Sequence, residues 1–382
     1  MQPNLRVHTL TLIIVALGWM NVSAQTNIYF TSYFIRDDNA FKSREAYEEW
    51  INNSTLHLGY RFVGNTYQFQ GYYSTDFLTF ANNGGLNNYA HKFGVSGRLD
   101  NDEYTISIHS FARLHNYKEP YIYYNVNRYF LNASFQYNPN LKHIYSLGLT
   151  VNKDRYSEFE ELDNLIYRIY VRFQRFFQSK ISITGEAGLG IKNYVNQSVI
   201  QYFGVGLGPR SFTRDREDPV RATIFSLSAI IGKSITSHLG VSLGLGGQWF
   251  VGDPIMAYSN GIYYYTENDL YDDPYSYQNH YITLHLTKQF AVGFQGKIGV
   301  KYQSKDYAGT PAIGDDGNVT DETREDSRSE YFIMITKKFE TGWRFPGSID
   351  LFFNFMYRNN PSNDPYYDYE DHIGLLGFSV GL

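Results

Sequence analysis

The sequence predicts an all-β protein, a transmembrane antiparallel up-and-down β-barrel of about 16 strands, with 14 as the alternative count. Segments of about ten residues alternate apolar with polar side chains, which is the period of a β-strand and the length of a membrane strand. Short and long connections alternate between these segments. The composition is rich in aromatic residues, with 36 Tyr and 28 Phe, and its low mean hydropathy excludes a bundle of apolar membrane helices.

The net charge and the lack of cysteine exclude further classes of protein and site. The chain has 33 Lys and Arg against 38 Asp and Glu, a net charge of −5, so no basic field is available to hold a nucleic acid. Cysteine is absent. Disulfides, thiolate metal sites, a cysteine nucleophile and the acylated cysteine of a lipoprotein are therefore all excluded.

The N-terminal residues 1–24 have the features of a signal peptide. A basic stretch with Arg6 precedes an apolar run over residues 10–19, and the small residues Ser23 and Ala24 suit signal peptidase. A buried N-terminal helix is the alternative. We expect cleavage to leave a barrel domain over residues 25–382, located in the bacterial outer membrane, with the periplasm or the medium as alternative destinations.

The alternation is clearest in four segments, in which every second residue is apolar: residues 56–62, 104–108, 145–151 and 167–173. Successive strand side chains point to opposite sides, so each segment presents two faces to two different environments. A secreted β-sandwich or β-propeller shares this period. The uniform strands, the alternating loop lengths and the tyrosines near strand ends, such as Tyr60, Tyr137 and Tyr29, favour the membrane barrel with its aromatic girdles.

The connections predict the strand number. Short turns are expected at residues 63–65, 100–102, 138–141, 178–180, 236–237, 291–293 and 341–347. Long outer loops are expected at residues 37–53, 81–88, 116–126, 154–164, 196–220, 253–279, 306–329 and 359–370. One more outer loop than periplasmic turn is what an even number of strands requires when both termini face the periplasm. Loop 196–220 is the candidate for a constriction folded into the lumen, with an exposed loop as the alternative.

The C-terminal segment 376–382 has an apolar residue at every second position. It resembles the closing strand of bacterial outer-membrane barrels, although it ends on Leu382 where those strands usually end on Phe or Trp. The resemblance implies that the barrel-assembly machinery recognises this strand and that outer-membrane lipid surrounds the barrel. Residues 359–369 resemble the final outer loop of barrels from surface-export systems, but the sequence lacks the helical repeats that usually accompany them.

If the apolar residues face lipid, their neighbours line the interior. The predicted pore-lining residues are Arg61, Arg98, Arg113, Arg128, Arg168, Arg172, Glu186, Lys192, Lys297 and Lys301. Other members of the same predicted inward set are His57, Gln68, Gln70, Lys92, His109, Asn132, Gln136, Lys142, Gln248, Asp350, Asn354 and Arg358. Such a wall is basic and favours small anionic solutes. The alternative is that several of these side chains lie at the periplasmic rim.

Loop 253–279 combines aromatic rings with carboxylates at Tyr263, Tyr265, Asp269, Asp272 and Asp273. This pairing suits stacking on the sugar rings of a surface glycan or holding Ca²⁺, and a solvated loop tip is the alternative. The acidic run near Gly317 does not fit a calcium loop, and we expect a turn there. The ten histidines form no zinc signature, and we expect neither metal nor cofactor.

Two candidate catalytic pairs are weak. Ser107 and His109 have no evident orienting group, and Asp371 and His372 are adjacent on a strand, so they point to opposite faces. The favoured function is a non-enzymatic channel for passive passage of small polar or anionic solutes. The second hypothesis is a barrel of an export system that binds a surface glycan or protein or serves as a scaffold, and the third is an outer-membrane hydrolase.

Overall fold

The computed structural model describes residues 23–382 except 43, 141, 159, 161–162, 195–197, 205–208, 216–220, 253–272, 291–292, 342–346 and 382. The strands are β1 (Ser23–Asp37), β2 (Glu49–Val63), β3 (Tyr67–Phe80), β4 (Asn88–Asp100), β5 (Tyr104–Tyr117), β6 (Val126–Asn140), β7 (His143–Tyr156), β8 (Asn164–Phe176), β9 (Ile181–Tyr194), β10 (Ser198–Gly204), β11 (Pro209–Asp215), β12 (Arg221–Ser234), β13 (Leu239–Phe250), β14 (Gln278–Gln289), β15 (Phe294–Ile313), β16 (Val319–Glu340), β17 (Ser348–Asn360) and β18 (Tyr369–Gly381). Short 3-10 helices are η1 (Gly84–Leu86), η2 (Ile122–Tyr124) and η4 (Pro274–Ser276). Because residues 1–22 lie outside this description, the signal peptide stays a prediction.

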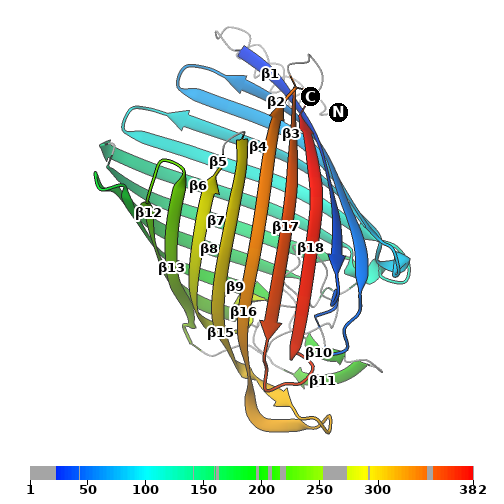
Figure 1. Cartoon of the computed structure of the whole chain (residues 1–382). Coiled ribbons are helices and arrows are strands. Elements are labelled where there is room, and N and C mark those ends of the chain that lie inside the picture. Colours follow the sequence, from blue (N-terminus) through cyan, green and yellow to red (C-terminus); the bar gives the residue numbers. More distant parts are fainter. Residues whose placement is uncertain are drawn as a thin grey trace, which may run out of the picture.

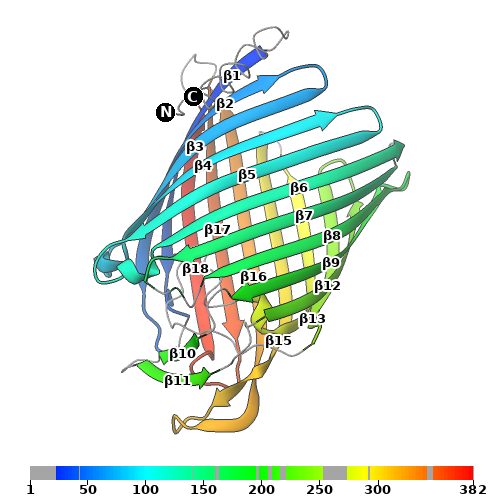
Figure 2. The ribbon, with the colours of Figure 1, turned by 180° about the vertical axis from the view of Figure 1, so that it is seen from behind.

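Sixteen of these strands form one closed antiparallel barrel, and β10 and β11 pair only with each other. Figures 1 and 2 show the barrel wall from opposite sides. The first and last strands close it, with Phe34 opposite Leu376 and Tyr29 opposite Gly381. The predicted fold class and the larger strand count are therefore confirmed. Among the described residues, no helix is long and apolar enough to cross a membrane.

The predicted alternation of connections also holds. The strand ends joined by the seven short turns lie at the end of the barrel where β1 begins and β18 ends, and the strand ends joined by the long connections lie at the opposite end (Figure 1). Two loops differ from the prediction. Residues 196–220 contain the β10–β11 hairpin, and β15 and β16 continue through most of residues 306–329. Only residues 314–318 connect β15 to β16, and there Gly317 has a φ of 75° while Asp316 accepts hydrogen bonds from Asn318. The expected turn at Gly317 is thus present.

Large apolar side chains cover the outer face of the barrel. Val171 is 55% exposed and Leu376 is 60% exposed, and many Leu, Ile and Phe residues on neighbouring strands are comparably exposed. A soluble protein does not leave so continuous an apolar surface in water, whereas hydrocarbon solvates it at no cost. The sandwich alternative fails, since these side chains do not pack in a dry interior. Tyr29 departs from its predicted place in the aromatic girdle, because it is paired with inward-facing His57 and their rings lie 6.0 Å apart.

The buried apolar core lies inside the barrel at its loop end. One cluster joins Ile35, Ile51 and Ile373 on the wall to Leu86, with Phe41 and Tyr121 from neighbouring loops packed against it. A second cluster packs Tyr275 of η4 against wall residues, which are Val126, Tyr156, Tyr194, Ala222 and Ile224. Segments of four long connections therefore fold into the outer mouth, and their burial holds them there.

Candidate functional site

The candidate site is the inner wall below this packed mouth. The strand register places all ten predicted pore-lining residues on the face opposite the apolar belt. Lys92, from the wider predicted inward set, shares this face and is directly paired with Arg113, which is paired in turn with Arg128. Placement on this face is a matter of register, and their part in conduction stays a prediction.

Two arginines of β8 share one carboxylate of β9. Arg168 lies 2.8 Å and Arg172 lies 2.6 Å from the carboxylate oxygens of Glu186. Both guanidinium groups also lie near the ring of Tyr170, at 5.9 and 5.6 Å from its centroid. The side chains of both arginines are 45% exposed although they project into the barrel. The cluster carries a net charge of about +1 at neutral pH, since two cations face one anion.

Carboxylates outside the predicted pore-lining set pair with other basic residues of the inner wall. Arg98 lies 2.7 Å from Asp100, and Arg128 lies 2.8 Å from Asp154. Arg113 lies 3.3 Å from Asp76. Asp76, Asp100 and Asp154 occupy strand positions that point to the same face as their arginine partners. The alternation of strand side chains is therefore enough to predict that these three acids lie inside. The wall is consequently less basic than the sequence predicts.

Lys192 and Asp273 pair with each other. Their ion pair measures 2.5 Å, both side chains are buried, and the hydroxyl of Tyr194 donates to the same carboxylate at 3.1 Å. The sequence predicts a pore-lining role for Lys192 and a ligand-binding role for Asp273, whereas in the structure both residues hold η4 against the wall. Tyr263, Tyr265, Asp269 and Asp272 lie outside the described residues.

Other cations of the wall lie over aromatic rings. The Nζ of Lys92 is 4.5 Å from the centroid of Phe111, and the Nζ of Lys297 is 5.5 Å from that of Phe332. Within the described part of the chain, neither ammonium has a carboxylate within ion-pair distance. Arg61 donates to the side-chain oxygen of Gln68. These cations leave the inner wall with an excess of positive charge.

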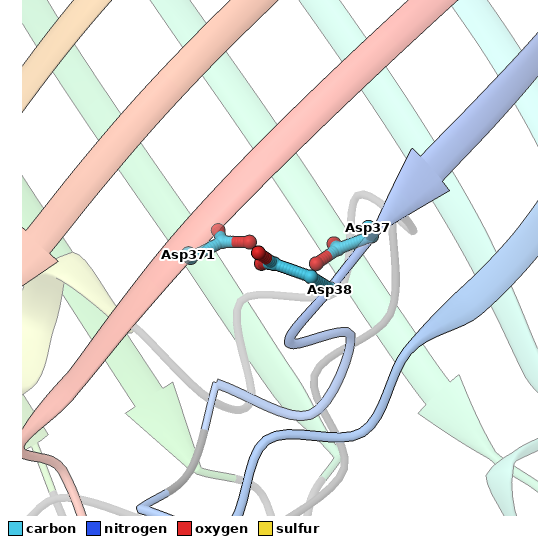
Figure 3. Close-up of side chains that lie close together, drawn as sticks. All are labelled: Asp37, Asp38 and Asp371. Carbon is cyan, nitrogen blue, oxygen red and sulfur yellow. The ribbon is translucent and has the colours of Figure 1, made fainter.

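A buried clamp joins the first loop to the closing strands. The Nζ of Lys42 lies 2.7 Å from Asp37 and 2.6 Å from Asp371, and all three side chains are fully buried. Figure 3 shows Asp37 at the end of β1, Asp371 on β18 and Asp38 close to both. Burial lowers the pKa of Lys42, and the two carboxylates oppose that shift. Because the ammonium lies between Asp37 and Asp371, the cluster is a structural ion network rather than a metal site.

The two candidate catalytic pairs have other partners. Asp371 faces the interior, while His372 faces outward and its Nδ1 lies 2.8 Å from Asp38. Alternation therefore separates Asp371 from His372, as expected. His109 hydrogen-bonds through Nε2 to the hydroxyl of Tyr72 at 2.8 Å, and Ser107 hydrogen-bonds to Ser134.

The closed barrel, its apolar outer belt and its polar inner wall define a transmembrane barrel of the outer-membrane type. Solved structures with this fold include OccAB1 of Acinetobacter baumannii, at 12% identity and a TM-score of 0.52, covering 94% of this chain and 97% of that one. A double variant of OccD1 (OprD) aligns at 8% identity and a TM-score of 0.51, covering 95% of this chain and 96% of that one. At these identities the likeness shows the fold alone.

A family model described as surface lipoprotein assembly modifier matches residues 249–379, which is less than half of the chain. The matched region runs from the end of β13 to β18. No curated protein sequence matches this chain.

Proposed function

We propose that this protein is an outer-membrane channel for the passive passage of small polar or anionic solutes. The observation that carries the proposal is the exposure of Arg168 and Arg172, whose side chains are 45% exposed inside a closed barrel. Charged groups with that exposure are solvated by water, so the proposal gives the barrel a wet interior at this level. Sixteen strands are wide enough to leave an aqueous passage.

The excess of positive charge supports the anion preference. The Arg168–Glu186–Arg172 cluster, Lys92 and Lys297 each add about one positive charge that no nearby carboxylate cancels. Cations along a pore lower the electrostatic barrier for anions. The loops packed into the outer mouth narrow the entrance, which restricts the proposed passage to small solutes.

The proposal includes the route to the membrane. Residues 1–24 direct export, the strand β18 presents its alternating apolar residues to the assembly machinery, and the apolar belt contacts outer-membrane lipid. Replacing Phe378 and Val380 of that strand with serine tests this part, because it is expected to lower the amount of heat-modifiable barrel in outer-membrane fractions. Unchanged assembly would contradict it.

Planar-bilayer recording tests the channel. The purified full-length barrel is expected to give stable ohmic current steps with a reversal potential on the anion side in asymmetric KCl, whereas detergent without protein gives none. Insertion is verified on the same preparation by its shift in electrophoretic mobility on heating. Inserted barrels that give no steps, or steps without anion preference, would contradict the proposal.

A second candidate function is favoured by the family match over residues 249–379. In this case the barrel belongs to a surface-export system, where it binds a surface glycan or a protein, or serves as a scaffold. This second function predicts that the purified barrel gives no current steps in a planar bilayer. It also predicts that deleting the gene for this chain from its host removes a cargo from the cell surface. Ohmic channels and an unchanged cell surface would exclude it.

A further inference from the structure

Three neighbouring rows of side chains run across the inner wall from β3 to β6. Within each row, the positions on neighbouring strands lie directly opposite one another in the antiparallel pairing. Successive rows are two residues, about 7 Å, apart along the strands. The cation row, nearest the loops, consists of Lys92, Arg113 and Arg128. The aromatic row consists of Tyr72, Phe111 and Phe130, and the polar row, nearest the periplasmic turns, consists of Gln70, Ser96, His109 and Asn132.

The cation row carries about one net positive charge. Arg113 is paired with Asp76 and Arg128 with Asp154, whereas Lys92 lies over the ring of Phe111. Three cations therefore face two carboxylates among the described residues. A single positive charge matches one carboxylate group better than a doubly charged phosphate.

The aromatic row gives the wall a continuous apolar strip. A methyl group on Gly94 would overlap the ring of Tyr72, so this ring lies against the backbone of β4, with the rings of His57 and His109 next to it. Phe111 and Phe130 lie beside it with their centroids 4.8 Å apart and an angle of 18° between their planes. All three rings are partly exposed. Such a surface suits the C–H face of a sugar ring.

The polar row supplies hydrogen-bonding groups on the other side of the rings. The Tyr72 hydroxyl and His109 Nε2 lie 2.8 Å apart, and the Asn132 amide donates to Thr150 at 2.9 Å. The hydroxyl, imidazole and amide groups keep further donors and acceptors. A sugar ring centred on the aromatic row thus has cationic side chains on one side, for its carboxylate, and hydrogen-bonding partners for its hydroxyls on the other.

We infer that this wall binds an acidic monosaccharide, a hexuronate, with its carboxylate at the cation row, its ring over the aromatic row and its hydroxyls toward the polar row. The inference rests on the proposed function in one respect, since it needs a wet lumen. Each part of the solute has a separate row, so each part is testable by itself.

Single-channel recording with galacturonate tests the inference. We expect concentration-dependent blockades of the current, and an apparent dissociation constant about fivefold higher in Phe111→Ala and in Lys92→Gln, the factor expected when a ring contact or one charge is lost. Galactose lacks the carboxylate and benzoate lacks the hydroxyls, so both are expected to block more weakly. Tyr281→Ala is the matched control, because Tyr281 covers Gly246 on another part of the wall in the same way and is expected to leave the blockade unchanged.

The outcomes separate this inference from the channel itself. Conducting barrels that galacturonate does not block, or blocks equally in every variant, would overturn the inference and leave the channel standing. Barrels that do not conduct would contradict the channel. In that case calorimetric titration of galacturonate into the detergent-solubilised barrel and the same variants decides whether the wall binds the sugar acid.

Discussion

Replacing Arg168 and Arg172 together with glutamine changes the charge of the inner wall by two units and leaves Glu186 without its two partners. The cluster then passes from about +1 to about −1. An ion passing about 8 Å away in water interacts with each unit charge by about 0.5 kcal/mol. Two units amount to about 1 kcal/mol, or about a fivefold change in the permeability of one ion, which screening at 0.1 M salt reduces to about twofold. Because Cl⁻ and K⁺ shift in opposite directions, their permeability ratio is expected to change about fourfold.

The same cluster supplies an ordered series of variants. Glu186→Gln raises the local charge to about +2, Arg172→Gln lowers it to about zero, and the double variant lowers it to about −1. The ratio of Cl⁻ to K⁺ permeability, obtained from reversal potentials in a KCl gradient, is expected to fall in that order, with the unmodified barrel between the first two. Lys153→Gln on the outer face of β7 is the control and is expected to change nothing. A reversal potential that stays constant across the series would refute the reasoning.

Three further predictions concern stability. Lys42→Met removes the cation between Asp37 and Asp371 and is expected to cost about 3–5 kcal/mol; amide hydrogen exchange of residues 35–42 should accelerate, and unchanged protection would rule out the clamp. Gly94→Ala forces the ring of Tyr72 from its place and is expected to cost about 1–3 kcal/mol in urea unfolding; the cost should disappear in a Tyr72→Ala background, and an equal cost in both would disprove the close contact. Burial raises the pKa of Asp364 in the last outer loop, so the folded state takes up this proton more readily than the unfolded state. Lowering the pH from above that raised pKa toward the ordinary value should therefore increase the protection of this loop, measured as its exchange rate relative to that of an unfolded amide at the same pH. Asp364→Asn should abolish this increase; the same pH dependence of protection in both proteins would contradict the assignment.

Strand positions and the two faces were predictable from local pattern. Residues 167–173 alternate without interruption, and β8 has Ile169 and Val171 outside and Arg168 and Arg172 inside. Every short turn follows from the same pattern, since the apolar period breaks where the chain reverses. The sequence also identified β18 as a terminal strand, which the structure pairs with β1.

The pairing of charges and the infolding of loops were not predictable in this way. Lys192 meets Asp273 across 81 residues of sequence, and Lys42 meets Asp371 across the barrel seam. Such contacts depend on which strands become neighbours when the barrel closes and on where each loop settles. Similarly, β15 and β16 continue past the predicted strand ends through a polar stretch with no apolar period. Tyr307 and Arg324 are buried there, and the Arg324 guanidinium lies over the rings of Tyr307 and Tyr367. This packing and the backbone hydrogen bonds of the hairpin maintain the strands.

The central claim is that alternate residues of each strand face hydrocarbon and water. Because the chain contains no cysteine, single cysteines at positions 168 to 172 of β8 test it directly in lipid vesicles. Cysteines at 168, 170 and 172 are expected to react with a charged, water-soluble thiol reagent, and those at 169 and 171 are expected to resist it but to carry labels that lipid-borne quenchers reach. Equal reactivity along the strand, or the opposite alternation, would contradict the claim.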